Sequence, residues 1–204
     1  DVYKRQAVFI QSRRHTLHFF PEDLLSPTSI ERIRKAAAQG LGVLVVVNTV
    51  SRAQALYQAL ASDKTYHCEL LHGRYHQKDR NRKESLLMKS RAVGTAHRTG
   101  MLLIATQVVE VSLNVDFDCL YTDLAPIDAL LQRFGRVNRT PSKNRTLKPV
   151  NVSSLVPASS LPYEEPMLRA TLRELLPLQD QPVDESGLQS VIDAVYSGSL
   201  ADDW

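Results

Sequence analysis

The chain has 204 residues, of which 43% are hydrophobic and 23% are charged, and its formal net charge is +3. These values favour one soluble α/β domain with a small appendage. They argue against a membrane protein, because the longest aliphatic runs, 43–47 and 101–105, are far shorter than the roughly 20 residues of a spanning helix. Two cysteines, Cys68 and Cys119, are too few for a disulfide framework. We therefore expect a cytoplasmic protein.

Short aliphatic runs alternate with segments of helical period along the first three quarters of the chain. In chain order, we predict strands at 17–20, 43–48, 67–71, 101–106, 117–124 and 150–155, and helices at 27–39, 51–61, 77–89 and 127–134. Ser26 and Pro27 mark the first helix start, Gly40 its end, and Ser51 the cap of the second helix. Continuous apolarity is typical of strands buried on both faces, so this order predicts a doubly wound α/β domain with a parallel sheet.

Three segments are predicted along the chain. Residues 1–15 have no initiating Met and no signal-peptide core, so we expect them to be the truncated end of something longer. Residues 16–156 hold the α/β domain. After 157 the composition changes to Pro, Ser and acidic residues with helical patterns at 164–176 and 188–196, which predicts a small helical accessory segment over 157–204.

The charge is unevenly distributed along the chain. Residues 72–100 carry eight basic and two acidic side chains, and residues 129–150 carry six basic and no acidic ones. Such a basic middle favours a surface that binds a polyanion, and ordinary solvated helix faces are the alternative.

The sharpest pattern is Q-R-x-G-R-x-x-R, formed by Gln132, Arg133, Gly135, Arg136 and Arg139. On a helix, residues three apart lie on the same face, so both later guanidinium groups would point the same way. A forked, permanently charged donor suits a transferring phosphoryl group, because negative charge builds on its oxygens. The glycine would let the backbone pack closely. An ordinary basic helix is the alternative.

This pattern resembles motif VI of superfamily 2 helicases. The preceding segment 102–126, LLIATQVVEVSLNVDFDCLYTDLAP, resembles motif V of the CRISPR-associated helicase/nuclease of type I systems. Segments 45–60 and 70–80 resemble two further motifs, and the resemblance covers about 41–196. It implies a RecA-like fold and the second motor domain of an ATP-dependent single-stranded DNA translocase or helicase.

The resemblance also implies cofactors and partners. The chain has no G-x-x-x-x-G-K-[ST] phosphate loop and no Asp-Glu box, so ATP and Mg would be bound mainly by a first motor domain, and this chain alone would not hydrolyse ATP. The divalent metal of the nuclease domain would also lie outside this chain. The implied partners are single-stranded DNA, the first motor domain, the nuclease domain and an RNA-guided surveillance complex, with no membrane.

Roles for single residues follow from the same resemblance. The implied catalytic residues are Gln132, Arg136 and Arg139. The implied cofactor-binding residues are Asn114, Asp116 and Gly135. The family has Asp where this chain has Asn114, which weakens a ribose contact, and often His where it has Asn138. Glu110 and Asp116 could steer the arginines or coordinate through water, and structural ion pairs are the alternative.

Parallel sheets bind ligands at the carboxyl ends of their strands. The implied nucleic-acid contacts are Thr49, His72, Arg74, Thr106 and Gln107, since hydroxyl, amide and basic groups suit phosphate and sugar. For the two threonines, capping of the next turn is the alternative.

Cys68, His72 and His76 have the four-residue spacing of a metal site. Gly73 would break the helix that aligns them and no fourth ligand is apparent, so no metal site is predicted.

Two other functions remain open. A generic RNA or DNA helicase of superfamily 2 would share the arginine pattern but not the strings ATQVVE and TDLAPID. A RecA-like module used only for protein docking would not need Arg136 and Arg139.

Overall fold

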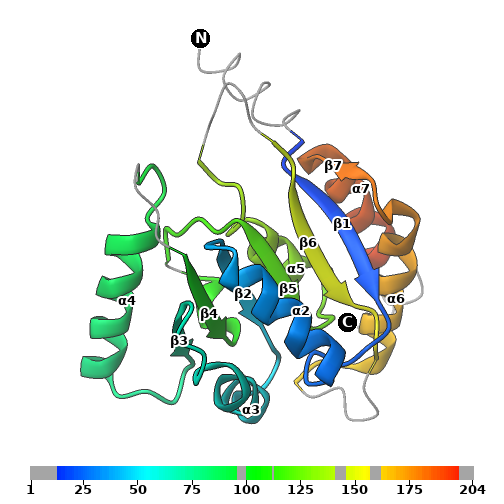
Figure 1. The fold of residues 1–204 in the computed structure, drawn as a ribbon. Helices are drawn as coiled ribbons and strands as arrows, with labels where there is room; N and C mark the ends of the chain where they lie inside the picture. The colour runs from blue at the N-terminus through cyan, green and yellow to red at the C-terminus, as the bar shows by residue number, and fades with distance from the viewer. Residues whose placement is uncertain (1–12, 96–99, 112, 141–145, 157–161, 198–204) are drawn as a thin grey trace.

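The computed structural model describes residues 13–95, 100–111, 113–140, 146–156 and 162–197 (Figure 1). Its seven-stranded sheet has the order β3-β4-β2-β5-β6-β1-β7. The strands are β1 (His15–Phe20), β2 (Gly42–Val46), β3 (His67–Leu71), β4 (Met101–Ala105), β5 (Cys119–Thr122), β6 (Lys148–Ser153) and β7 (Pro182–Val183). All neighbouring pairs are parallel except β7, which pairs antiparallel with β1.

Helices pack on both faces of this sheet. They are α2 (Pro27–Ala38), α3 (Val50–Leu60), α4 (Gln77–Arg91), α5 (Ile127–Phe134), α6 (Glu165–Leu175) and α7 (Glu185–Tyr196), with short 3-10 turns η1 (Gln107–Val109) and η2 (Leu176–Leu178). Successive side chains of β2 point to opposite faces: Val43 and Val45 join the core under α2 and α3, whereas Leu44 and Val46 join the core under α4 to α7. The predicted RecA-like, doubly wound fold is therefore confirmed.

The residues after 161 add to this same core. The core under α4 to α7 includes Leu168 and Leu175 of α6 and Leu188 and Val191 of α7. Strand β7 extends the sheet beyond β1. In Figure 1, α6 and α7 lie beside β1. Helix α7 also contacts α5. None of the helices in the described part of the chain combines the length and the apolarity that crossing a bilayer requires.

Several predicted boundaries agree with the structure and one cap does not. The strand at 67–71 and the helix at 127–134 are observed with the predicted bounds. The cap of α3 is Thr49 rather than Ser51: Thr49 has an extended backbone, and its Oγ1 accepts a hydrogen bond of 3.4 Å from the amide of Arg52. A hydroxyl at this position satisfies one of the free amides of the first turn.

Some members of the predicted basic surface are instead buried, among them Arg91. Arg91 is fully buried at the end of α4, and its Nη1 donates to Asp118 Oδ2 at 3.0 Å. The same carboxylate oxygen accepts from the amide of Gly42 at 2.8 Å, and an added Cβ at Gly42 would collide with the guanidinium. Arg91 thus ties α4 to β2 and β5, and cannot bind an external polyanion.

Candidate functional site

The predicted nucleic-acid residues come together at the carboxyl ends of three adjacent strands. Thr49 follows β2, His72 and Arg74 follow β3, and Thr106 and Gln107 follow β4. Hydrogen bonds tie these ends together. The amide of Thr106 donates to the Leu71 carbonyl at 3.2 Å, and Gln107 Nε2 donates to the Asn48 carbonyl at 2.8 Å.

Within this group the residues differ in accessibility. Arg74 is exposed and Gln107 half-buried, whereas His72 is 5% and Thr106 is 3% exposed. The His72 ring stacks on Tyr75 with centroids 4.2 Å apart, and its Nδ1 accepts from the amide of Arg74 at 3.2 Å. His72 therefore shapes the loop that presents Arg74, so the predicted direct contact by its side chain does not fit this geometry.

The position of His72 has a consequence for pH. Burial, with the charges of Arg74 and Lys83, lowers the pKa of His72 below its ordinary value of 6.5. Because the unfolded chain then binds the proton more tightly, the contribution of His72 to stability is complete above about pH 6.5 and is lost as the pH falls through the folded-state pKa. We expect the parent to lose more unfolding free energy than His72→Gln between about pH 8 and about pH 5, measured by urea denaturation. Equal losses of unfolding free energy in the two proteins would show that the pKa of His72 is not lowered by folding.

The arginine motif does not form one helical face. Helix α5 ends at Phe134 with Gly135 as its C-cap, so Arg136 and Arg139 lie in the following loop, where Asn138 has a φ of 52°. The prediction of a shared helical face is wrong because the chain leaves the helix before either arginine. A Cβ at Gly135 would meet only carbonyls of its own helix, at 3.4 Å, so no other element of the described chain approaches closely there.

Asp116 fixes the backbone of this loop. It is 1% exposed; its Oδ1 accepts from the amide of Arg139 at 2.8 Å, and its Oδ2 accepts from the amide and the hydroxyl of Thr140 at 2.8 and 2.5 Å. Both oxygens are used inside the protein, so the predicted contact with a cofactor does not fit, and the alternative role of steering an arginine does. The side chain of Asn114 is exposed, and its ribose contact stays a prediction.

A cleft of about 280 Å³ opens beside the loop, lined by Arg14, Gln132, Gly135, Arg136 and Arg139. The Arg136 guanidinium donates to the carbonyls of Leu113 and Glu110 at 2.6 and 2.5 Å. Burial, together with repulsion from Arg139, lowers the pKa of Arg136 from its ordinary value.

Two nitrogens of the arginines that line this cleft, Arg136 Nε and Arg139 Nη1, are buried and donate no hydrogen bond to any described residue. An unmade hydrogen bond at a buried donor costs about 1–3 kcal/mol, so such donors are where an anionic ligand gains most. The arrangement therefore suits a phosphate group. Arg14 was missed in the sequence because it precedes β1, far from the motif along the chain.

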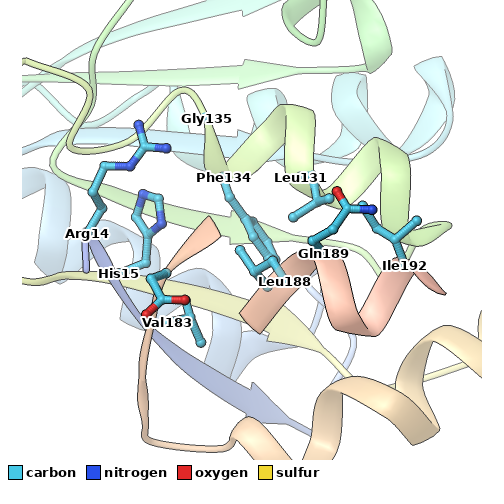
Figure 2. Close-up of a pocket in the computed structure, with 10 residues that line it drawn as sticks. Arg14, His15, Leu131, Phe134, Gly135, Val183, Leu188, Gln189 and Ile192 are labelled. Atoms are coloured by element: carbon cyan, nitrogen blue, oxygen red, sulfur yellow. The ribbon is translucent and has the colours of Figure 1, made fainter. Parts of the chain in front are cut away.

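A pocket of about 270 Å³, lined by both apolar and polar side chains, lies next to this cleft, between α5 and α7. Figure 2 shows Phe134 of α5 facing Leu188 of α7, with Arg14 and His15 at the start of β1. Arg14 lines both cavities, and the His15 Nε2 lies 2.8 Å from the carbonyl of Val137 in the arginine loop. The start of β1 thus links the arginine loop to the pocket beside α7.

Arg133, the first arginine of the motif, points inward and is fully buried. Its Nε donates to Glu110 Oε1 at 2.8 Å, which makes Glu110 part of a structural ion pair. The remaining acceptors are Thr122 Oγ1, the Asp123 carbonyl, Asn48 Oδ1 and the Tyr163 hydroxyl, at 2.8, 3.1, 3.1 and 3.4 Å. Arg133 lies between the strand ends and the arginine loop and connects them.

In the described residues, no three His, Cys, Asp or Glu side chains are grouped as metal ligands. Cys68 lies within β3, and burial raises the pKa of its thiol to about 12.

Comparison with known proteins identifies the relatives of this fold and site. Residues 39–142 match the family model of the CRISPR-associated nuclease/helicase Cas3, C-terminal. The chain belongs to the Cas3 family. A putative CRISPR-associated nuclease/helicase Cas3 of Methanocaldococcus jannaschii is 30% identical over 168 residues, which are 82% of this chain and 23% of that protein.

Solved Cas3 structures agree in fold. The T. fusca Cas3-ADP crystal structure superimposes with a TM-score of 0.80 at 24% identity, covering 95% of this chain and 25% of that one. A CRISPR RNA-guided surveillance complex in a pre-nicking state contains a chain that superimposes with a TM-score of 0.73 at 23% identity, covering 94% of this chain and 26% of that one. This chain therefore spans about a quarter of the length of its Cas3 relatives.

Proposed function

We propose that this chain is the second motor domain of an ATP-dependent single-stranded DNA helicase or translocase in CRISPR interference, and that it supplies arginines to ATP held by a first motor domain. The cleft with the unpaired Arg139 Nη1 carries the proposal, because a buried donor beside two further arginines is complementary to a phosphoryl group. The names of the Cas3 relatives, which are nuclease/helicases, support the class.

In this proposal each residue of the cleft has a distinct part. Bound ATP would transfer its terminal phosphoryl group to water and leave ADP, and Mg would be held mainly by the first motor domain. Arg139 would donate to its oxygens as charge develops, and Arg136 would add a second positive charge. Asp116 already holds the Arg139 backbone, so little reorganisation is needed when the domains close. Gln132 is exposed at the rim, where it can contact ATP or water.

Single-stranded DNA would follow the carboxyl edge of the sheet. Arg74, Gln107 and Thr49 lie there, and hydroxyl, amide and guanidinium groups hold phosphate and sugar without reading sequence. Opening and closing of the two motor domains would move the strand along this edge. The nuclease domain and the RNA-guided surveillance complex are the proposed partners, and the cytoplasm is the proposed location.

The chain alone tests the DNA part of the proposal. We expect it to bind an oligo-dT strand weakly, with affinity that falls steeply with salt, and to show no DNA-stimulated ATP turnover. The logarithm of the DNA-binding constant falls linearly with the logarithm of the salt concentration, and Arg74→Ala should make this slope shallower by about 0.7. That is the value for one phosphate contact with single-stranded DNA. Fluorescence anisotropy measures the binding constants.

Arg34→Ala is the matched control, because Arg34 lies on α2 and already pairs with Glu31 at 2.6 Å. It should leave the slope unchanged. DNA-stimulated ATP turnover by the chain alone would overturn the division of labour between two motor domains.

A further inference from the structure

The structure assigns to Tyr163 a role as a positioning residue that links the DNA edge of the sheet to the arginine loop. This inference rests on the proposed function. Tyr163 precedes α6 and lies outside residues 39–142, in the segment that the sequence predicts to be a mere accessory. Its ring packs against the buried core, and its hydroxyl reaches two polar side chains of the site.

The tyrosine oxygen stands between two nitrogen donors. Gln107 Nε2 donates to it at 3.5 Å and Arg133 Nη2 donates to it at 3.4 Å. Both distances exceed the roughly 2.7–3.2 Å that is typical of N–H···O bonds, so each contact is weak in this arrangement. A small movement of Gln107 toward a DNA strand would free the hydroxyl to shorten its bond to Arg133. The hydroxyl can therefore favour either of two arrangements of its neighbours, as a switching element requires.

From Arg133 the contacts continue to the arginine cleft. Gln107 Nε2 also donates to the Asn48 carbonyl at 2.8 Å, and Arg133 Nη2 donates to Asn48 Oδ1 at 3.1 Å. Arg133 Nε donates to Glu110 Oε1 at 2.8 Å, and Arg136 Nη2 donates to the Glu110 carbonyl at 2.5 Å.

These contacts form an unbroken path from the proposed DNA contact Gln107 to the cleft. Arg133 at its centre is fully buried, so no solvent can replace a partner that moves. Displacement of Gln107 then shifts Arg133 and, through it, Glu110, whose carbonyl accepts a hydrogen bond from Arg136. Tyr163 sets how firmly Gln107 and Arg133 are held together.

Tyr163→Phe removes only the hydroxyl and tests this role in the full-length protein. We measure ATP turnover with and without an oligo-dT strand. We expect the ratio of DNA-stimulated to unstimulated kcat to fall by about fivefold or more, the lower end of typical coupling between sites. The KM for ATP should stay within about twofold of the parent, because no ATP contact is removed.

Two other tyrosines provide matched controls for loss of a hydroxyl. Tyr196 of the same C-terminal segment lies 3.1 Å from Asp128 Oδ1, and Tyr66 donates to the Leu60 carbonyl at 2.9 Å, both away from the path. Tyr196→Phe and Tyr66→Phe should keep the parental stimulation ratio.

Three outcomes would overturn the assignment. If Tyr163→Phe keeps the parental ratio of DNA-stimulated to unstimulated kcat, Tyr163 does not link the two sites. If this ratio falls equally in all three variants, the effect comes from general packing. A parent whose ATP turnover does not respond to oligo-dT fails the proposed function itself. That last result differs from the first two, in which the parent is stimulated.

Discussion

Arg133→Met is expected to lower the free energy of unfolding by about 3–5 kcal/mol, the usual cost of breaking one side of a buried ion pair. Arg133 is fully buried, and its loss leaves the Glu110 carboxylate, 14% exposed, without its cation. Asn48 Oδ1 and Thr122 Oγ1 lose their donor as well. Urea denaturation of the chain measures the change directly.

The double variant Arg133→Met with Glu110→Gln tests the physical reason. Removing the orphaned charge should restore part of the loss, so the two changes should not add. Arg173→Met is the control, since Arg173 pairs with Glu174 at 2.9 Å but its side chain is 72% exposed, and it should cost only about 0–1 kcal/mol. A loss below about 1 kcal/mol in Arg133→Met would show that Arg133 does not hold this part of the site together.

The regular elements of the fold were predictable because the order of apolar residues along each element indicates which of its faces are buried. Five consecutive buried residues in β2, and again in β4, mark strands covered on both faces. Helix α5 shows its buried side through Leu130 and Phe134, four residues apart. These patterns are local in sequence, so the parallel sheet and the helix positions follow from them.

The partners of charged residues were not predictable in the same way. Arg91 and Asp118 meet in the core although 27 residues separate them, and a basic residue on a polar helix gives no sign of this. The same holds for Asp116 and the Arg139 amide, and for Tyr163 and Gln107, 23 and 56 residues apart. Charge counts along the chain describe composition, whereas function depends on which charges remain without a partner after folding.

The arginine motif shows both the reach and the limit of the sequence argument. Four of its residues line the cleft, and the family that it resembles is confirmed by the match of residues 39–142. The prediction that Arg136 and Arg139 lie on one face of a helix was wrong, because α5 ends at Phe134 and Gly135 is its C-cap. The two arginines also differ: both have a buried nitrogen without a hydrogen-bond partner among the described residues, but only Arg136 donates to two backbone carbonyls, those of Leu113 and Glu110.

Arg139→Ala is expected to reduce ATP turnover far more than ATP binding. An arginine that stabilises charge in the transition state contributes about 10³ to 10⁵ in rate, or about 4–7 kcal/mol in the barrier. Ground-state affinity should change much less, since the charge on the transferring group is greatest in the transition state. Arg136→Ala should act in the same direction, but it also releases the carbonyls of Glu110 and Leu113, so Arg139 gives the cleaner test.

DNA-stimulated ATP hydrolysis by Arg139→Ala in the full-length protein therefore tests the central claim most directly. Nucleotide affinity is measured in parallel, thermal melting shows that the variant is folded, and Arg34→Ala serves as the control of equal charge. The account predicts a folded protein that binds ATP with near-parental affinity and turns it over at least about 10³-fold more slowly. A folded variant whose turnover stays within about threefold of the parent, a barrier change of about 0.7 kcal/mol, would contradict it.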